Sequence, residues 1–138
     1  MYWLVLFTVA ALVVLGAIVR ARSAGAPANG LPAHAACSRC YEIVPTSEVR
    51  VLPWWNEQLA NFVTSYRCSA CFAPSLAETR TRIEGMDGET ATLLSDFFIR
   101  HQQPTIAARI ARGGPDAERA ARAAIDDLER GALELRIG

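Results

Sequence analysis

Hydrophobic residues are most concentrated at the start of the chain. Residues 2–19 read YWLVLFTVAALVVLGAIV without a charge, and Arg20 and Arg22 follow closely. A helix of this length spans about 27 Å, close to the ~30 Å hydrocarbon core of a bilayer. The pattern therefore predicts a transmembrane anchor at 1–22, in contact with the membrane through 2–19. Because positive residues favour the cytoplasmic side, it also predicts an external N-terminus and a cytoplasmic C-terminal domain.

A cleaved signal peptide is the alternative interpretation of this end. Small residues at 23–28 resemble a cleavage site, but no basic residue precedes the apolar run, as one does in signal peptides. Residues 23–36 contain small residues, proline and glycine without periodicity, which is typical of a linker. We therefore expect the folded part of the protein to follow this linker.

The middle of the chain carries mixed patterns. Alternation at 48–52 predicts a strand that the PWW sequence at 53–55 would end, and 56–63 have the spacing of a short helix. Residues 66–72 indicate a strand, whereas 79–83 are compatible with a helix or a strand. This part of the chain thus predicts a mixture of strands and short helices.

Three helices are predicted in the last third of the chain. Leu94, Phe97 and Phe98 share one face of the first helix. Pro104 and Pro115 begin the second and third helices, because proline is favoured in a first helical turn. The apolar face of the third helix is small and consists of Ala117, Ala121, Ala124, Ile125 and Leu128. Alternation at 133–137 predicts a final strand.

Composition narrows the class of protein. The 138 residues are 51% hydrophobic and 20% charged, with a formal net charge of zero. These values exclude a mainly disordered chain and a protein whose whole surface is a polycation for nucleic acid. All 14 cationic residues are arginines, which together with many alanines indicates a GC-rich bacterial genome and hence a bacterial inner membrane. Residues 97–115 contain three arginines and no acid, which is compatible with a basic surface for an anionic partner or with a solvated helix pair of mixed charge.

Two CxxC pairs carry the strongest chemical pattern. Cys37 and Cys40 form the first pair, and Cys68 and Cys71 form the second. Two intervening residues let both sulfurs of a pair converge on one ion, and two pairs complete the tetrahedron that structural zinc prefers. Thiolates favour zinc or iron over magnesium or calcium. The sequence therefore predicts a four-cysteine metal site, with zinc as the expected structural metal and iron as the alternative.

The paired knuckles resemble those of zinc-ribbon and treble-clef domains, over residues 37–84. The resemblance implies metal ligation by the four cysteines alone. This chain has Tyr41 and Phe72 where such knuckles commonly have glycine after the second cysteine. A c-type haem is excluded, because neither pair is followed by histidine.

The patterns together predict an α+β protein with a single N-terminal transmembrane helix, a small four-cysteine zinc-ribbon-like domain and C-terminal helices. The predicted parts are an anchor at 1–22, a linker at 23–36, the zinc-ribbon-like domain at 37–84 and a helical region at 85–138. Because a region of about fifty residues rarely folds on its own core, the fold of the second domain is expected to depend on its metal.

Other uses of the cysteines remain open. Two redox disulfides would need a βαβ context that the chain lacks, and structural disulfides would need an exported domain. His34 could replace one ligand, although four thiolates already fill a tetrahedron. Arg39 and Arg67 adjoin the pairs and are expected to offset part of the −2 charge of a zinc tetrathiolate.

The expected function is that of a membrane-anchored adaptor, an accessory component of a membrane assembly with a protein partner. The chain has no phosphate-binding loop, nucleophile elbow or HExxH helix, so neither an enzyme nor a small-molecule substrate is inferred. One alternative is a membrane-tethered nucleic-acid-binding zinc ribbon, but 37–71 hold three arginines against three glutamates. The other alternative is a thiol redox sensor.

Overall fold

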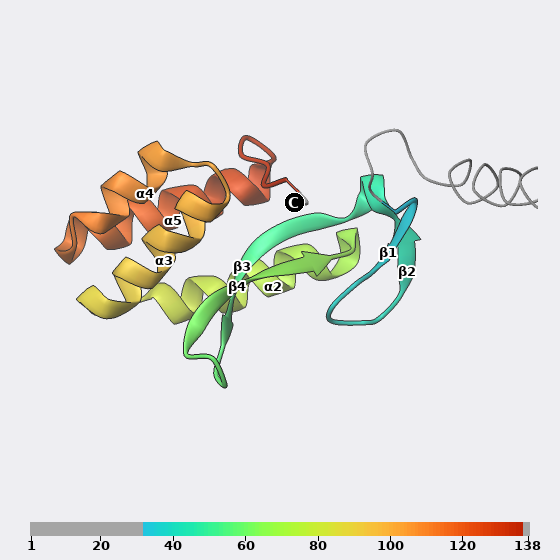
Figure 1. Cartoon of the computed structure of the whole chain (residues 1–138), viewed down its shortest axis with the longest axis horizontal. Helices are drawn as coiled ribbons and strands as arrows, with labels where there is room; N and C mark the ends of the chain where they lie inside the picture. Colours follow the sequence, from blue (N-terminus) through green and yellow to red (C-terminus); the bar gives the residue numbers. More distant parts are fainter. Residues whose placement is uncertain (1–31, 137–138) are drawn as a thin grey trace, which may run out of the picture. The chain divides into compact units, whose positions relative to one another are not determined.

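The computed structural model describes residues 32–136 (Figure 1). Their fold is α+β, with two separate two-stranded sheets and four α-helices among the described residues. In chain order the elements are β1 (His34–Ala36), β2 (Ile43–Pro45), the 3-10 turn η1 (Thr46–Glu48), β3 (Arg50–Asn56), β4 (Asn61–Arg67), α2 (Ser69–Ile83), α3 (Gly88–Arg100), α4 (Pro104–Ala111) and α5 (Gly114–Arg130).

The predicted fold class and location need correction. Among residues 32–136, no helix has both the length and the apolar character needed to cross a bilayer. The longest of these helices, α5, has charged residues on its exposed side, and only its other side is buried. The apolar run at 2–19 lies outside the described residues. The fold class with a transmembrane helix, and the single-pass inner-membrane localisation derived from it, are therefore wrong by this finding.

The β3–β4 hairpin replaces the predicted strand end and short helix. The strand β3 continues through Pro53 and the two tryptophans, and residues 61–67 pair with it antiparallel. Trp54 lies opposite Val63 and Trp55 opposite Phe62, with the rings of Trp55 and Phe62 5.1 Å apart. Cross-strand aromatic pairs of this kind stabilise a hairpin. Proline is tolerated in β3 because a strand of a two-stranded sheet has one unpaired edge.

Helix α2 packs against this hairpin (Figure 1). It starts directly after β4, so the strand predicted at 66–72 ends at Arg67, and the ambiguous residues 79–83 are helical. Thr79 donates from Oγ1 to the Pro53 carbonyl oxygen at 2.8 Å. This buried hydrogen bond satisfies a carbonyl of β3 and fixes α2 across the hairpin.

The three C-terminal helices follow the predicted boundaries closely. Asp87 caps α3 by accepting a hydrogen bond from the Thr90 N–H at 2.7 Å, and Gly131 ends α5 in the left-handed conformation. Residues 133–136 form no strand. Leu135 is instead buried against the core as irregular chain.

The hydrophobic core is continuous across residue 84. Its buried members are Val51, Leu52, Phe62, Phe72, Leu76, Ile83, Ala91, Leu94, Phe97, Phe98, Ala107, Ile110, Ala117, Ala121, Ala124, Ile125, Leu128 and Leu135. These residues come from β3, β4, the four helices and the C-terminal tail, and β1 and β2 contribute none of them. The β1–β2 hairpin, which carries the first cysteine pair at its turn, must therefore be held by other interactions.

Candidate metal centre

The first cysteine pair lies in the turn between β1 and β2. The Arg39 N–H donates to Cys37 Sγ at 3.4 Å, and the Tyr41 N–H donates to the Cys37 carbonyl oxygen at 2.9 Å. The chain returns through a bond from the Cys37 N–H to the Glu42 carbonyl oxygen at 2.9 Å. These bonds fold the backbone tightly around the Cys37 sulfur and bring the Cys40 sulfur to the same side.

The backbone conformations of Tyr41 and Phe72 differ at the two positions where such knuckles commonly have glycine. Tyr41 has a φ of +61°, the left-handed conformation for which glycine is the usual residue. Phe72 is part of α2, where the backbone needs no positive φ. The first knuckle thus keeps the expected backbone despite its tyrosine, whereas the second is a helix start and has no need of glycine.

The second cysteine pair lies at the start of α2. Cys68 is the N-cap residue, and Cys71 is in the first turn, with its N–H donating to the Cys68 carbonyl oxygen at 3.1 Å. The N-terminal end of a helix carries a partial positive charge, so the second pair lies where negative charge on the cluster is favoured. The first turn of the helix itself brings these two cysteines together, so the second pair does not need a tight turn like the one between β1 and β2.

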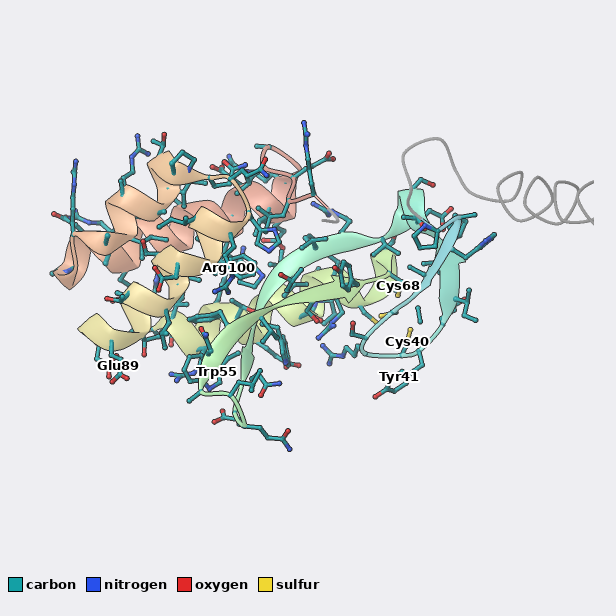
Figure 2. All side chains as sticks on the ribbon, viewed as in Figure 1. Cys40, Tyr41, Trp55, Cys68, Glu89 and Arg100 are labelled. Atoms are coloured by element: carbon teal, nitrogen blue, oxygen red, sulfur yellow. The ribbon has the colours of Figure 1, made fainter. Side chains whose placement is uncertain are left out.

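The β1–β2 turn is fixed to the second pair through β4. The Ser38 N–H donates to the Tyr66 carbonyl oxygen at 2.8 Å, and the Tyr66 N–H donates to Ser38 Oγ at 3.4 Å. Arg39 reaches α2, where its guanidinium lies 3.1 Å from a carboxylate oxygen of Glu78. Backbone bonds and one ion pair therefore dock the first knuckle beside the start of α2 (Figure 2).

All four predicted cysteines come together in this way. Their Sγ atoms lie within 4.8 Å of one another, and Cys40 and Cys68 are 3.7 Å apart (Figure 2). Zinc–sulfur bonds of ~2.3 Å in a tetrahedron place sulfurs roughly 3.8 Å apart, so the cluster has the size of a metal site. None of the four forms a disulfide, and Cys37 and Cys68 are buried whereas Cys40 is exposed. The prediction of a four-cysteine metal-binding cluster is confirmed, without the identity of the metal.

The sulfurs cannot all ionise without a cation. Burial raises the pKa of the Cys37 thiol, but the N–H groups of Cys40, Cys68 and Arg39 outweigh burial and lower that pKa to about 6. A hydrogen bond with the Cys68 side chain raises the pKa of Cys71 to about 12. One thiolate thus forms readily and disfavours the next, because like charges at this spacing repel. A divalent cation among the sulfurs removes this conflict.

No protein-family model, curated protein or solved structure matches this chain. The functional assignment therefore depends on the cluster itself and on the side chains around it.

Arg67 is a buried cation that directly precedes Cys68 and interacts electrostatically with Cys37 and Cys71. Its side chain is only 3% exposed. It donates from Nε to Ser75 Oγ at 2.9 Å and from Nη1 to Ser65 Oγ, and its guanidinium lies 4.9 Å from the centre of the Trp54 ring. In residues 32–136 it forms no ion pair with a carboxylate. A buried cation without an acid is costly, and thiolates of the adjacent cluster can balance it.

Sequence reasoning named both flanking arginines but could not distinguish them. Arg39 is paired with Glu78, so part of its charge is already balanced. Arg67 depends on two serines from β4 and α2, and no sequence pattern predicts such partners. His34 is exposed on β1 and is not a member of the cysteine cluster.

Proposed function

We propose that this protein is a zinc-binding protein in which a structural tetrathiolate site fixes a protein-interaction surface. The observation that carries the proposal is the convergence of four sulfurs within 4.8 Å from two separate elements. Four thiolates fill the tetrahedral coordination shell of a zinc ion and leave no position for water or substrate. Such a closed coordination shell is typical of structural sites. We accordingly propose a non-enzymatic role.

Zinc is favoured over iron as the bound metal. Zn²⁺ generally binds a given site more tightly than Fe²⁺. Zn²⁺ also has no redox chemistry, which suits a purely structural site. A first knuckle between strands and a second at a helix start is more similar to a treble clef than to a ribbon built from strands alone. The metal would connect the β1–β2 hairpin to the helical body.

The surface that the metal would hold in place is partly apolar. Tyr41 is 78% exposed and Ile43 is 71% exposed, and both belong to the chain segment leaving the first knuckle. Tyr41 also adopts a left-handed backbone conformation that is energetically unfavourable for a tyrosine. Strained backbone conformations of this kind cluster at functional sites. We propose this pair as the contact for a protein partner.

The metal assignment is tested on the full-length chain. We expect one zinc per chain by elemental analysis, and loss of zinc in Cys37→Ser and Cys68→Ser. Thiol titration should find the cysteines unreactive until a chelator is added. Iron in the purified protein, or free thiols in a folded and metal-free chain, would contradict the zinc proposal. Reversible disulfides that form while zinc stays absent would favour the redox alternative.

The partner surface is tested with variants that retain zinc. Tyr41→Ala with Ile43→Ser should abolish partner capture by affinity purification, whereas Leu59→Ser should not. Leu59 is a suitable control, because it is 67% exposed in the turn between β3 and β4, away from the knuckle. Equal loss of capture in both variants would contradict a specific surface at the knuckle. Capture of nucleic acid with a steep salt dependence would favour the nucleic-acid alternative.

A further inference from the structure

A polar cavity lies where the end of α3 meets β4 and the C-terminal tail. Its volume is about 560 Å³, within the range of small-molecule sites. Among residues 32–136, the lining consists of polar and aromatic side chains, including Arg100 and His101 from the end of α3, Thr64 and Tyr66 from β4, and Arg136 from the tail. Such a lining disfavours an apolar ligand.

The charges around the cavity favour an anion. Arg100 and Arg136 contribute two positive charges, and Glu134 contributes the one carboxylate among the described lining residues. Burial, together with the charge of Arg100, lowers the pKa of His101, so this imidazole is neutral near pH 7. Helix α4 begins at Pro104, immediately after the lining residue Gln103, and the C-terminal end of α3 lies at the same cavity, so the opposite partial charges of the two helix ends offset each other and the arginines provide the positive charge.

One of the two arginines is held in place, and the other is free to bind. Arg100 donates from Nη2 to the Phe62 carbonyl oxygen at 3.0 Å, which fixes its guanidinium at the edge of β4 (Figure 2). Within residues 32–136, neither Arg100 nor Arg136 forms an ion pair with a carboxylate. The side chains of Gln102 and Gln103 likewise make no hydrogen bond within this described part, so their amides are available as donors and acceptors.

The backbone beside the cavity is also unusual. Gln102 has a φ of +59° between α3 and α4, in the left-handed region that a glutamine rarely adopts. His101 is positioned by a hydrogen bond of 2.7 Å between its Nε2 and Thr64 Oγ1. A constrained turn therefore presents several polar side chains to one space.

We propose that this cavity binds a small organic anion through its phosphate or carboxylate oxygens, with Arg100 and Arg136 as the charged contacts. Guanidinium groups match both oxyanions with paired N–H donors. The amides of Gln102 and Gln103 would contact the polar body of the molecule, and Glu134 would accept from its hydroxyl groups. This site does not depend on the metal proposal.

Three probes with the same sugar scaffold test the proposal on the full-length chain as purified, with any bound metal retained. Glucose 6-phosphate, glucuronate and glucose carry a phosphate, a carboxylate and no charge, and binding is measured by calorimetry and by NMR shifts of the lining residues. We expect at least one anionic probe to bind about tenfold or more tightly than glucose. The stronger of the two anions identifies the preferred oxyanion.

Variants of the lining residues then distinguish binding in the cavity from nonspecific electrostatic attraction to the protein surface. Arg136→Gln should weaken binding at least about fivefold without affecting folding, because Arg136 is exposed and its side chain forms no hydrogen bond or ion pair within residues 32–136. Arg100→Gln should weaken it similarly, and Glu134→Gln should tighten it. Arg112→Gln is the matched control, because it removes an exposed arginine that does not line the cavity. Equal binding of the three probes, no binding at all, or equal weakening by the control would overturn the proposal.

Discussion

Arg67 and Ser75 are joined by a buried hydrogen bond, from the arginine Nε to the serine Oγ at 2.9 Å. Arg39 reaches the same oxygen with Nη1 at 3.4 Å, so one hydroxyl of α2 receives both arginines that flank the cysteines. The bond connects the end of β4 to the buried face of α2 directly beside the sulfurs. It gives the buried guanidinium a fixed place from which to balance negative charge on the cluster.

Replacing Arg67 should weaken both folding and zinc binding. In Arg67→Met, Ser65 and Ser75 lose their buried donor, and the cysteine cluster loses a buried cation that interacts with the charge of Cys37 and Cys71. We expect a loss of about 2–4 kcal/mol in the free energy of unfolding of the zinc-loaded chain, and a zinc Kd raised at least about tenfold. Denaturant titration and competition with a chelator measure the two quantities.

The variant Ser75→Ala separates these two effects. It removes the hydrogen bonds at Ser75 Oγ but keeps the positive charge, so stability should fall while the zinc Kd changes by less than about threefold. A Ser75→Ala variant with the same loss of zinc affinity as Arg67→Met would show that position, and not charge, is what the metal site requires.

Removal of the metal should loosen one end of the fold and leave the rest folded. The β1–β2 hairpin contributes no residue to the hydrophobic core, whereas α2 to α5 share it. A chelator should therefore leave the helical circular dichroism nearly unchanged and abolish the amide protection of residues 35–49. Complete unfolding, as the sequence led us to expect for residues 37–84, would show that the metal supports the whole domain.

The helical half of the fold was the easier part to predict from sequence. Helix ends favour proline in the first turn and glycine after the last, as found at Pro104, Pro115 and Gly131. The apolar face predicted for the first of these helices, with Leu94 and Phe97, is buried. The cysteine cluster was equally accessible, because the spacing within a CxxC pair limits how far two sulfurs can separate. Both depend on interactions between residues close in sequence.

The hairpin and the buried arginine could not be predicted in this way. Trp54 and Trp55 continue a strand because Val63 and Phe62 lie opposite them, and this pairing is visible only after the turn has formed. Arg67 is buried because Ser75, in the second turn of α2, comes to face it. In each case the deciding partner lies on another element, so local periodicity gave the wrong element or no prediction.

Tyr41 should be replaceable by glycine with a gain in stability. Its φ of +61° costs a non-glycine residue about 1 kcal/mol, and its exposed ring contributes little burial. We expect Tyr41→Gly to raise the free energy of unfolding of the zinc-loaded chain by up to about 1 kcal/mol, part of the gain being offset by the greater freedom of glycine in the unfolded chain. Tyr41→Ala keeps the strained backbone and is the control. A similar gain in Tyr41→Ala would place the cost in the tyrosine ring.

His101 should make the fold less stable as the pH falls below neutrality. Burial and the charge of Arg100 lower its pKa in the folded state, and the unfolded value is about 6.5. The unfolded chain therefore binds a proton at a higher pH than the folded one. The contribution of His101 is fully present above this unfolded value and is lost as the pH falls toward the folded value.

The variant His101→Gln removes this titration and keeps a side chain that can bond to Thr64 Oγ1. Between pH 7.5 and pH 5.5, its free energy of unfolding should fall less steeply than that of the wild type. Denaturant titrations at fixed zinc, with the metal content measured at each pH, isolate the difference from any loss of metal. Arg136→Gln is the matched control, because it changes a charge at the same cavity without removing an imidazole. Parallel curves for His101→Gln and the wild type would show that protonation of His101 does not distinguish the folded from the unfolded chain.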